Sequence, residues 1–200
     1  MSSIHSKLGA ALLLTFVAMN GVSAQSASEI IEKARAEAKE FNEFKLALED
    51  PDQSVRLAVF EQMLKQPAAP LRMMAIQAGL TSSDDIMRSR ALVAQILDMD
   101  HLVIHLKVNE KANSKSQEAT KKLLLRDGDV WRLSIRQKNP DDNTFSIGVG
   151  EYSGKVNGLQ VSLLRGPSGM HFQLDDNNRL VGRYTSPNGP IDAVVTMELF

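Results

Sequence analysis

The sequence predicts an α+β protein in which a helical segment, residues 25–99, is followed by a small antiparallel β-domain, residues 100–200. Up to Asp98 the apolar residues recur every three or four positions, which is typical of one face of a helix. Beyond it they alternate with polar residues, as in a half-buried strand, and turn-forming residues become frequent. Because the period changes between Asp98 and Asp100, we place the boundary between the segments there.

The N-terminus, residues 1–24, is interpreted as a cleaved secretory signal peptide. A short, weakly basic stretch precedes an apolar run at 8–19. Val22 and Ala24 then occupy the small-residue positions before a cut, which places the scissile bond between Ala24 and Gln25. The apolar run is shorter than the roughly 20 residues that span a bilayer, so a membrane anchor is the less favoured alternative. We therefore expect a periplasmic or secreted protein.

The composition excludes several classes of site. The chain contains no cysteine, so it carries no disulfide, thiolate nucleophile, iron–sulfur cluster or cysteine zinc site. Its 23 lysines and arginines nearly balance its 24 acidic residues, whereas a nucleic-acid-binding domain needs a clear basic excess. We therefore expect no nucleic-acid partner. Because no later stretch is sufficiently apolar, we also expect no transmembrane segment after removal of the signal.

Four helices are expected in the first segment. Ser26 and Glu29 form a capping box at the start of the first helix, in which each side chain can bond the backbone N–H of the other residue. Asp50 is expected to cap the second helix, with Pro51 at its first helical position. The second helix is apolar on two faces, which indicates that it lies between other elements.

The third and fourth helices are bounded by residues that favour helix ends. Pro70 is expected to open the third helix. Gly79 is expected to close it, because glycine readily adopts the left-handed backbone of a C-terminal cap. Ser82 or Ser83 is expected to cap the fourth helix, which runs to Leu97.

The stretch at 48–58, LEDPDQSVRLA, resembles the start of a HEAT repeat. That family favours a turn of Asp-Pro-Asp type, then a Val-Arg pair and an alanine on the following helix. A degenerate second copy begins at Ser83, and the resemblance covers 44–97 in all. An unrelated pair of helical hairpins is the alternative, because such repeats need about three units to be stable. The resemblance implies a scaffold for contacts with another protein or with the neighbouring domain, and no enzyme activity.

The second segment begins with a predicted strand at 101–108, in which large apolar residues alternate with polar ones. Residues 109–120 contain no large apolar side chain and are expected to form a mobile loop. The pair Asp127-Gly128 predicts a type I′ turn, because both central residues of that turn need positive φ. We therefore expect a hairpin of strands 121–126 and 129–138. Its inner face comprises Trp131, Leu133 and Ile135.

Further short stretches of alternating residues, separated by turns, follow to the C-terminus. They lie at 145–149, around Val156, and at 161–163, 170–174, 179–185 and 191–199. Roughly seven or eight short strands at this spacing predict a meander that forms a small barrel or a sandwich. A cone-shaped fold of helices and sheet is the alternative, and the number of later strands argues against it.

The residues that usually carry catalysis or bind metals form no recognisable constellation. His101 and His105 lie about 13 Å apart on a strand, too far to share a metal ion. Ser153 stands in a GEYSG stretch whose spacing differs from that of a nucleophile elbow. The paired aspartates, such as Asp175 and Asp176, fall at turns or helix starts, where aspartate bonds the nearby backbone. We assign no catalytic residue, metal or cofactor.

One group of residues has the composition that binding surfaces favour. Arg132 and Arg136 alternate with Ser134 on the expected outer face of their strand, and Tyr152 and Tyr184 are expected near sheet edges or loop mouths. Arginine and tyrosine are both enriched in protein interfaces. We predict that Arg132, Arg136, Tyr152 and Tyr184 contribute to binding. An ordinary solvated sheet face with half-buried tyrosines is the alternative.

These observations favour an exported, non-enzymatic binding or adaptor protein of the cell envelope that recognises a protein, a peptide or a glycan. An enzyme inhibitor or an immunity-type protein would have the same features. A carrier of a small apolar ligand would need a hollow lined by Trp131, Phe145 and Phe172. A hydrolase with scattered catalytic residues would need a pocket that brings His105 or His171 to a carboxylate.

Overall fold

The computed structural model describes residues 26–148, 152–186 and 189–200. The predicted signal peptide and its cleavage site between Ala24 and Gln25 lie outside the described residues. The chain divides into two compact units, Met1–Glu40 and Phe41–Phe200, and the second unit contains most of the described structure. The described chain is mixed helix and strand, with helices first and an antiparallel barrel after them.

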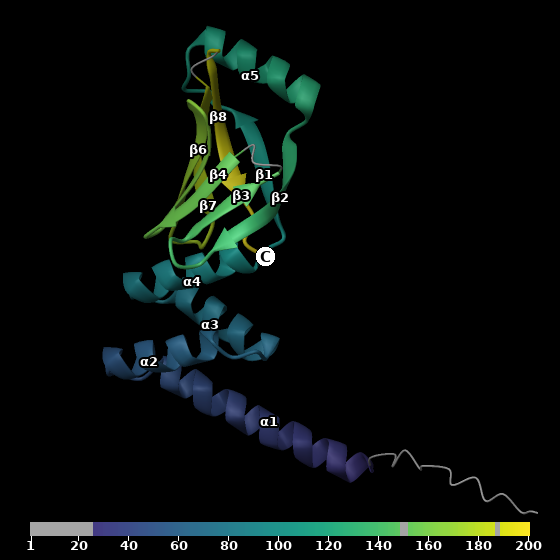
Figure 1. The fold of residues 1–200 in the computed structure, drawn as a ribbon, viewed down its shortest axis with the longest axis vertical. Coiled ribbons are helices and arrows are strands. Elements are labelled where there is room, and N and C mark those ends of the chain that lie inside the picture. The colour runs from purple at the N-terminus through teal and green to yellow at the C-terminus, as the bar shows by residue number, and fades with distance from the viewer. Residues whose placement is uncertain (1–25, 149–151, 187–188) are drawn as a thin grey trace, which may run out of the picture. The chain divides into compact units, whose positions relative to one another are not determined.

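The elements follow one another as the change of period predicts, with one further helix inserted between the first two strands (Figure 1). The helices are α1 (Ala27–Leu48), α2 (Gln53–Leu64), α3 (Ala69–Thr81), α4 (Asp85–Asp98) and α5 (Ser114–Asp127). The strands are β1 (His101–Val108), β2 (Val130–Asn139), β3 (Thr144–Ile147), β4 (Tyr152–Asn157), β5 (Gln160–Arg165), β6 (Ser168–Leu174), β7 (Leu180–Ser186) and β8 (Ile191–Met197).

The start of α1 is the capping box that the sequence predicts. The Ser26 N–H donates to Glu29 Oε2 (3.0 Å), and the Glu29 N–H donates to Ser26 Oγ (3.3 Å). As far as Glu40, every described residue of the helix is exposed, including Ile30 and Ile31. None of the described helices combines the length and the apolar character that crossing a bilayer requires.

The N-cap of α2 is Asp52, so the prediction that Asp50 caps this helix is wrong. Asp52 accepts the Ser54 N–H at 2.8 Å. Asp50 instead accepts the Asp52 N–H at 2.8 Å, so its carboxylate orders the turn before the helix. Pro51 belongs to this turn and lies outside the helix. The two aspartates of the Asp-Pro-Asp sequence thus have different roles, because Asp50 forms the turn and Asp52 caps the helix.

The N-cap of α4 also differs from the prediction, since it is Asp84 and neither Ser82 nor Ser83. Asp84 Oδ1 accepts the N–H groups of Ile86 (2.8 Å) and Met87 (3.3 Å). Ser82 Oγ accepts the Asp84 N–H at 3.1 Å and so supports the turn. A charged carboxylate is a stronger acceptor for the N–H groups of a helix start than a hydroxyl, which accounts for the choice.

Gly79 lies inside α3, and the prediction that it closes the helix is wrong. A Cβ at this position would stand 2.6 Å from the Ala91 Cβ and 2.7 Å from the Phe60 ring. Glycine is therefore needed for the close approach of α2, α3 and α4, and α3 continues to Thr81. The sequence pattern does not distinguish a glycine that ends a helix from one that makes room for a neighbouring helix.

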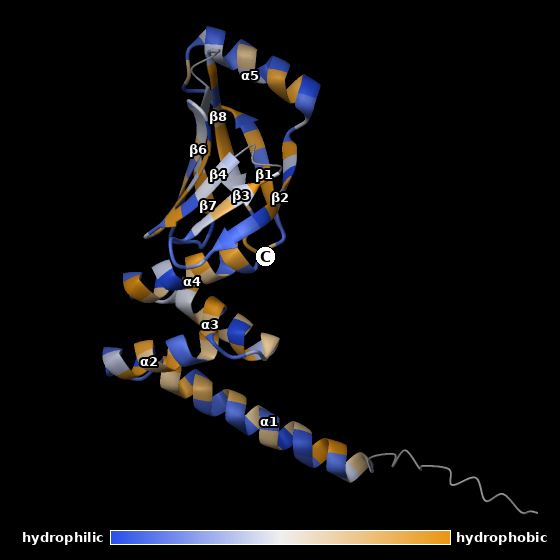
Figure 2. Ribbon diagram, in the orientation of Figure 1, coloured by the Kyte–Doolittle hydropathy of each residue, from blue (hydrophilic) through white to orange (hydrophobic). Residues whose placement is uncertain are grey.

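The β-domain is a closed barrel, which decides between the predicted barrel and sandwich. Each strand pairs antiparallel with the next, and β1 pairs with β8 to complete the ring. Hydrophobic and hydrophilic residues alternate along the strands (Figure 2). Those that face inward are buried, such as Leu102, Ile104 and Leu106 of β1. An eight-stranded barrel has an interior just wide enough for its own side chains to fill.

Residues 109–127 differ from the predicted mobile loop and strand, because they contain α5. Asn113 caps this helix by accepting the Ser116 N–H at 2.9 Å. Its buried face carries Ser116 and Thr120 among few large apolar residues. Thr120 Oγ1 donates to the Ser116 carbonyl (2.8 Å) and accepts the N–H of Asp192 in β8 (3.3 Å). A helix that packs through hydroxyl groups shows little apolar period, so the sequence pattern does not reveal it.

Gly128 is the C-cap of α5, so the predicted hairpin at Asp127-Gly128 is wrong. Gly128 has a φ of 80°, as a glycine turn would, but its N–H donates to the Leu124 carbonyl at 2.9 Å and ends the helix. β2 then pairs with β1, which places Trp131 opposite Ile104. Trp131 therefore belongs to the inner face of β2, as predicted.

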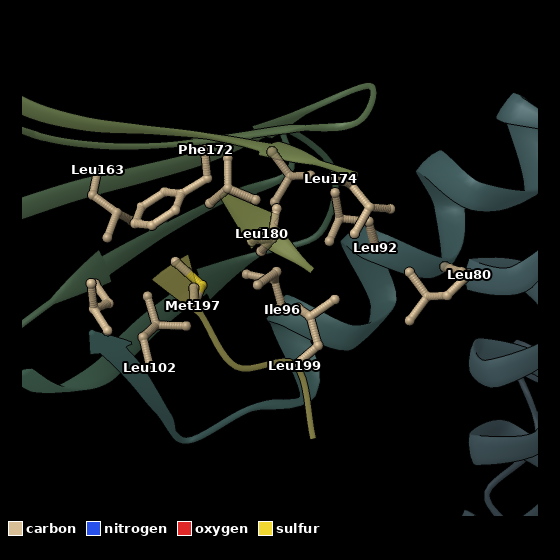
Figure 3. Close-up of a cluster of buried hydrophobic side chains, with 14 of the residues drawn as sticks. Leu80, Leu92, Ile96, Leu102, Leu163, Phe172, Leu174, Leu180, Met197 and Leu199 are labelled. Atoms are coloured by element: carbon tan, nitrogen blue, oxygen red, sulfur yellow. The ribbon is translucent and has the colours of Figure 1, made fainter. Parts of the chain in front are cut away.

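One hydrophobic core joins the helices to the barrel. Leu92 and Ile96 of α4 lie against Leu174, Leu180 and Leu199 at one end of the barrel (Figure 3). α5 lies at the opposite end, after β1 has crossed the barrel (Figure 1). The change from helix to strand falls between Asp98 and His101, whereas the compact unit begins at Phe41 and includes both kinds of structure.

Candidate functional site

The four predicted binding residues lie in two separate places. Arg132 and Arg136 are exposed on the outer face of β2. Tyr152, at the start of β4, and Tyr184, towards the end of β7, lie on the inner face at the α5 end of the barrel, as their buried cross-strand partners indicate. The structure does not bring the arginines and the tyrosines together into one site.

The two tyrosines belong to an aromatic cluster inside the barrel. Tyr184 is only 8% exposed and packs edge-on against Trp131, with ring centroids 5.6 Å apart. The Arg165 guanidinium lies 5.7 Å from the centroid of the Tyr152 ring, which is within cation–π distance. Burial raises the pKa of Tyr184 above its usual value. The tyrosines therefore pack this end of the barrel.

The histidines do not form the pocket that a hydrolase would need. His105 Nε2 lies 2.6 Å from Glu198 Oε1, but both side chains are exposed on the outside of the barrel. His171 Nδ1 lies 3.1 Å from Ser162 Oγ, again on the outer face, and no described carboxylate contacts its ring. A serine–histidine pair also needs an acid that orients the imidazole. Within the described ranges, no group of three or more histidine or acidic residues could hold a metal ion.

The residues that a ligand carrier would use to line a hollow are part of the core. Phe145 and Phe172 are buried, and Trp131 packs against the same cluster. Gly154 stands opposite Phe145 in β4, where an added Cβ would lie 2.2 Å from the phenylalanine ring. The interior at this level is therefore tightly packed, and the clefts described next open on the outer surface.

A cleft of about 600 Å³ lies beside α2, α3 and α4, where the turn between β2 and β3 meets them; we call it the helix–barrel cleft. Its apolar lining residues are Leu64, Val93, Ala94 and Leu97. Its charged lining residues are Glu61, Arg72, Arg90, Asp98 and Lys138. The β2–β3 turn contributes Pro140 and Asn143. The sequence predicts none of these residues as part of a site.

Arg72 fixes the shape of the helix–barrel cleft. Its Nε and Nη2 donate to the two carboxylate oxygens of Asp98 at 2.5 and 2.7 Å, and its Nη1 donates to the Leu64 carbonyl. One side chain thus joins the C-terminal ends of α2 and α4 to the start of α3. The hydrogen bonds to Asp98 raise the pKa of Arg72 above its usual value. Because the fork geometry is bidentate, this contact is more specific than a single ion pair.

A second ion pair, between Arg90 of α4 and Glu61 of α2, spans the same region. The partners of both ion pairs, Arg72–Asp98 and Arg90–Glu61, are far apart in sequence, so no local motif predicts them.

The helix–barrel cleft has properties that are common in binding sites. It offers apolar area and charged hydrogen-bonding groups, but no nucleophile activated by a neighbouring base. It also joins the two architectures of the chain, since its residues come from helices and from a barrel turn. Compared with family models, curated proteins and solved structures, the chain gives no significant match.

Proposed function

We propose that the protein is an exported, non-enzymatic adaptor of the cell envelope that holds a segment of a partner protein in the helix–barrel cleft. The observation that carries this proposal is the cleft itself, which apolar and charged side chains line together. Its volume of about 600 Å³ is in the range of specific ligand sites. A space of this size takes a few side chains of a peptide.

The chemistry of the cleft indicates what the partner segment offers. An apolar side chain would cover Leu64, Val93 and Leu97 and remove their surface from water. Arg72 and Arg90 already bond carboxylates of this chain, so they contribute mainly shape. Lys138 is the more available cation, because its nearest carboxylate oxygen, on Asp100, lies 3.8 Å away. We expect a segment that presents an apolar side chain next to a carboxylate.

The proposal includes the HEAT-like character of the stretch 44–97. Two features support it. Asp52 and Asp84 hold equivalent places as N-caps of α2 and α4, and an arginine follows each cap by four positions. Arg56 donates to the Asp50 carbonyl at 2.6 Å, while Arg88 donates to the Asp175 carbonyl of the barrel at 2.9 Å. Arg88 would thus bond the neighbouring β-domain, whereas Arg56 bonds the turn before its own helix.

Site-specific cross-linking tests the occupant of the cleft. A photo-reactive benzoylphenylalanine replaces Ser89, which lines the cleft, in the full chain expressed with its own N-terminus. Mass spectrometry then identifies the cross-linked protein and the peptide attached to position 89. The purified partner is expected to bind the chain from Gln25, and Ser89→Trp, which fills the cleft, is expected to weaken binding at least roughly tenfold.

Ser114→Trp provides the control, because Ser114 is exposed at the start of α5, away from the cleft. It is expected to leave affinity unchanged, and both variants should keep the thermal stability of the parent. A partner that cross-links elsewhere, or that binds Ser89→Trp with the same affinity, would contradict the proposal.

Export is tested separately from binding. The protein is purified from the periplasm or the medium of its source cell, and its first residues are sequenced. We expect the mature chain to begin at Gln25. Recovery of the protein only from the cytoplasm with Met1 in place would rule out the exported part of the proposal and leave the cleft as an independent question.

A further inference from the structure

The charged residues of the barrel strands are almost all basic. Across the eight strands the charged side chains are Lys107, Arg132, Arg136, Lys138, Lys155, Arg165, Arg183 and a single acid, Asp192. The whole chain has 24 acidic residues against 23 basic ones, so the excess of cations belongs to the strands, although Arg165 lies over the Tyr152 ring and not on the outer wall. The other acidic residues of the described chain lie in helices, in turns and next to the ends of strands.

The register of the barrel places polar residues in one row around its outer wall. Direct cross-strand partners run from β2 to β7 without interruption: Asn139, Thr144, Lys155, Ser162, His171 and Arg183. We call this row the outer girdle. It covers five strand-to-strand steps of about 4.8 Å each, which amounts to roughly 24 Å along the wall.

Two shallow grooves follow the outer girdle and share Ser162. One, of about 540 Å³, crosses β2 to β5 and is lined by hydroxyl, amide and lysine side chains, among them Gln137, Thr144 and Lys155. The other, of about 530 Å³, crosses β5 to β7 and contains His171 and Gln173. No carboxylate lines either groove. Together they form a continuous polar track across six strands.

The cations near β2 and β4 are the ones available to an external anion. Arg132, Arg136 and Lys155 are exposed and form no ion pair within the described part of the chain. Arg183, at the other end of the girdle, is already bonded to Asp192 through both of its donor nitrogens. The attraction for anions is therefore expected at Arg136 and Lys155, because Asn139, at the β2 end of the girdle, already donates to the Asp142 carboxylate (2.8 Å). The hydrophilic end of β2 lies in the same region (Figure 2).

We propose that the outer girdle binds an acidic polysaccharide, with the chain lying across the strands from β2 towards β7. Lys155 and Arg136 would pair with its acidic groups. Serine, threonine, asparagine and glutamine side chains, which both donate and accept hydrogen bonds, match the many hydroxyl groups of a sugar chain. The first groove meets the helix–barrel cleft at Lys138, which lines both. Lys155, Ser162 and His171 lie outside the cleft, so the inference does not depend on the function proposed above.

The composition of the track favours a glycan over an anionic membrane. A protein that settles on a bilayer inserts apolar side chains between the lipids. The outward-facing apolar residues in these grooves are Leu164 in the first and the half-buried Val181 in the second, and every other outward residue that lines the first groove is polar. A curved wall of hydroxyl and amide groups suits a flexible linear polymer better than a flat lipid surface.

The test measures fluorescence anisotropy of labelled hexasaccharides that carry carboxylate, sulfate or phosphate groups, with a neutral hexasaccharide for comparison. At least one acidic hexasaccharide is expected to bind about tenfold more tightly than the neutral one, and added salt should weaken the binding. Lys155→Glu and Arg136→Glu are each expected to weaken it at least about tenfold. Lys122→Glu makes the same change of charge at an exposed position of α5 and should leave the affinity for the hexasaccharide unchanged.

Three outcomes would overturn the proposal: no binding of any acidic hexasaccharide, equal binding of a polyglutamate peptide, or binding only of vesicles that contain phosphatidylserine. Circular dichroism and thermal melting show whether each variant is folded, and the Ser162→Ala variant adds an uncharged change in the same track. Ser89→Trp should bind the acidic hexasaccharide normally, so failure at one site remains distinct from failure at the other.

Discussion

The two ends of the barrel are covered by helices that attach in opposite ways. At one end, α4 inserts Leu92 and Ile96 into the core that it shares with the strands (Figure 3). At the other end, α5 packs with the hydroxyl of Thr120, which bonds the backbone of Asp192. The first contact is driven by apolar burial, whereas the second depends on a few hydrogen bonds.

The two ends also differ in how well their polar groups are satisfied. At the α4 end, Arg88 donates to the carbonyl of Asp175 in the β6–β7 turn, and Gln95 donates to the carbonyl of Leu199 beyond β8. At the α5 end, Trp131 Nε1 is buried and has no hydrogen-bond partner within the described residues. Because α4 combines apolar burial with these two hydrogen bonds, we expect the α4 end to contribute more to stability than the α5 end.

The largest effect is expected from Leu92→Ala in α4. Leu92 is completely buried, and its truncation leaves a cavity between the helix and the barrel. The free energy of unfolding is expected to fall by about 3 kcal/mol, measured by urea denaturation of the chain from Gln25. Leu125→Ala is the matched control in α5, where the side chain is 88% exposed, and it should change stability by less than about 0.5 kcal/mol. Similar losses of unfolding free energy for both variants would show that packing of α4 against the barrel does not stabilise the core.

A smaller effect is expected from Thr120→Val, which keeps the shape of the side chain and removes its hydroxyl. The Ser116 carbonyl and the Asp192 N–H each lose a partner, so the free energy of unfolding should fall by about 1–2 kcal/mol. Hydrogen exchange should show α5 opening before the rest of the barrel. Thr120→Ser keeps the hydroxyl and should lower the free energy of unfolding by less. If the valine and serine variants are equally stable, the hydroxyl does not hold α5 on the barrel.

The smallest effect concerns Asp192 and depends on pH. The hydrogen bond from Arg183 lowers the pKa of Asp192 below its usual value, and burial opposes this shift. The stabilisation is therefore complete above the pKa of an unfolded aspartate, about 3.9, and is lost as the pH falls through the lower folded pKa. Melting temperatures of the parent and of Asp192→Asn should differ at neutral pH and converge in acid. A difference that stays constant down to about pH 2 would contradict this account.

The apolar pattern of the sequence predicts most of the fold correctly. The change from helix to strand at Asp98 is confirmed, and so are the alternating strands and the capping box at Ser26. The pattern fails where polar groups determine the structure. Thr120 and Asn113 shape α5 by hydrogen bonds, which leave no periodicity, and the positive φ of Gly128 fits a helix end as well as a hairpin turn.

The candidate sites were less predictable than the fold, because they depend on register and on distant pairs. Arg72 and Asp98 meet only when α3 packs beside α4, and no spacing rule connects them. Each strand contributes one residue to the outer girdle, so in the sequence each of these residues looks like an ordinary surface residue. Arg132 and Arg136 could be placed on an outer face from alternation alone, but their neighbours on other strands could not.

The pairing of β1 with β8 has a consequence for recognition. Proteins with an open sheet can add a strand from a partner to the free edge, and the same edge can seed aggregation. Among the described residues, the ring from β1 to β8 gives each strand a paired neighbour on both sides. We therefore expect a ligand of this barrel to be recognised mainly through side chains, and not by the addition of a strand. Substitutions on the outer wall would thus change which ligand is bound without creating a free edge to which another strand could add.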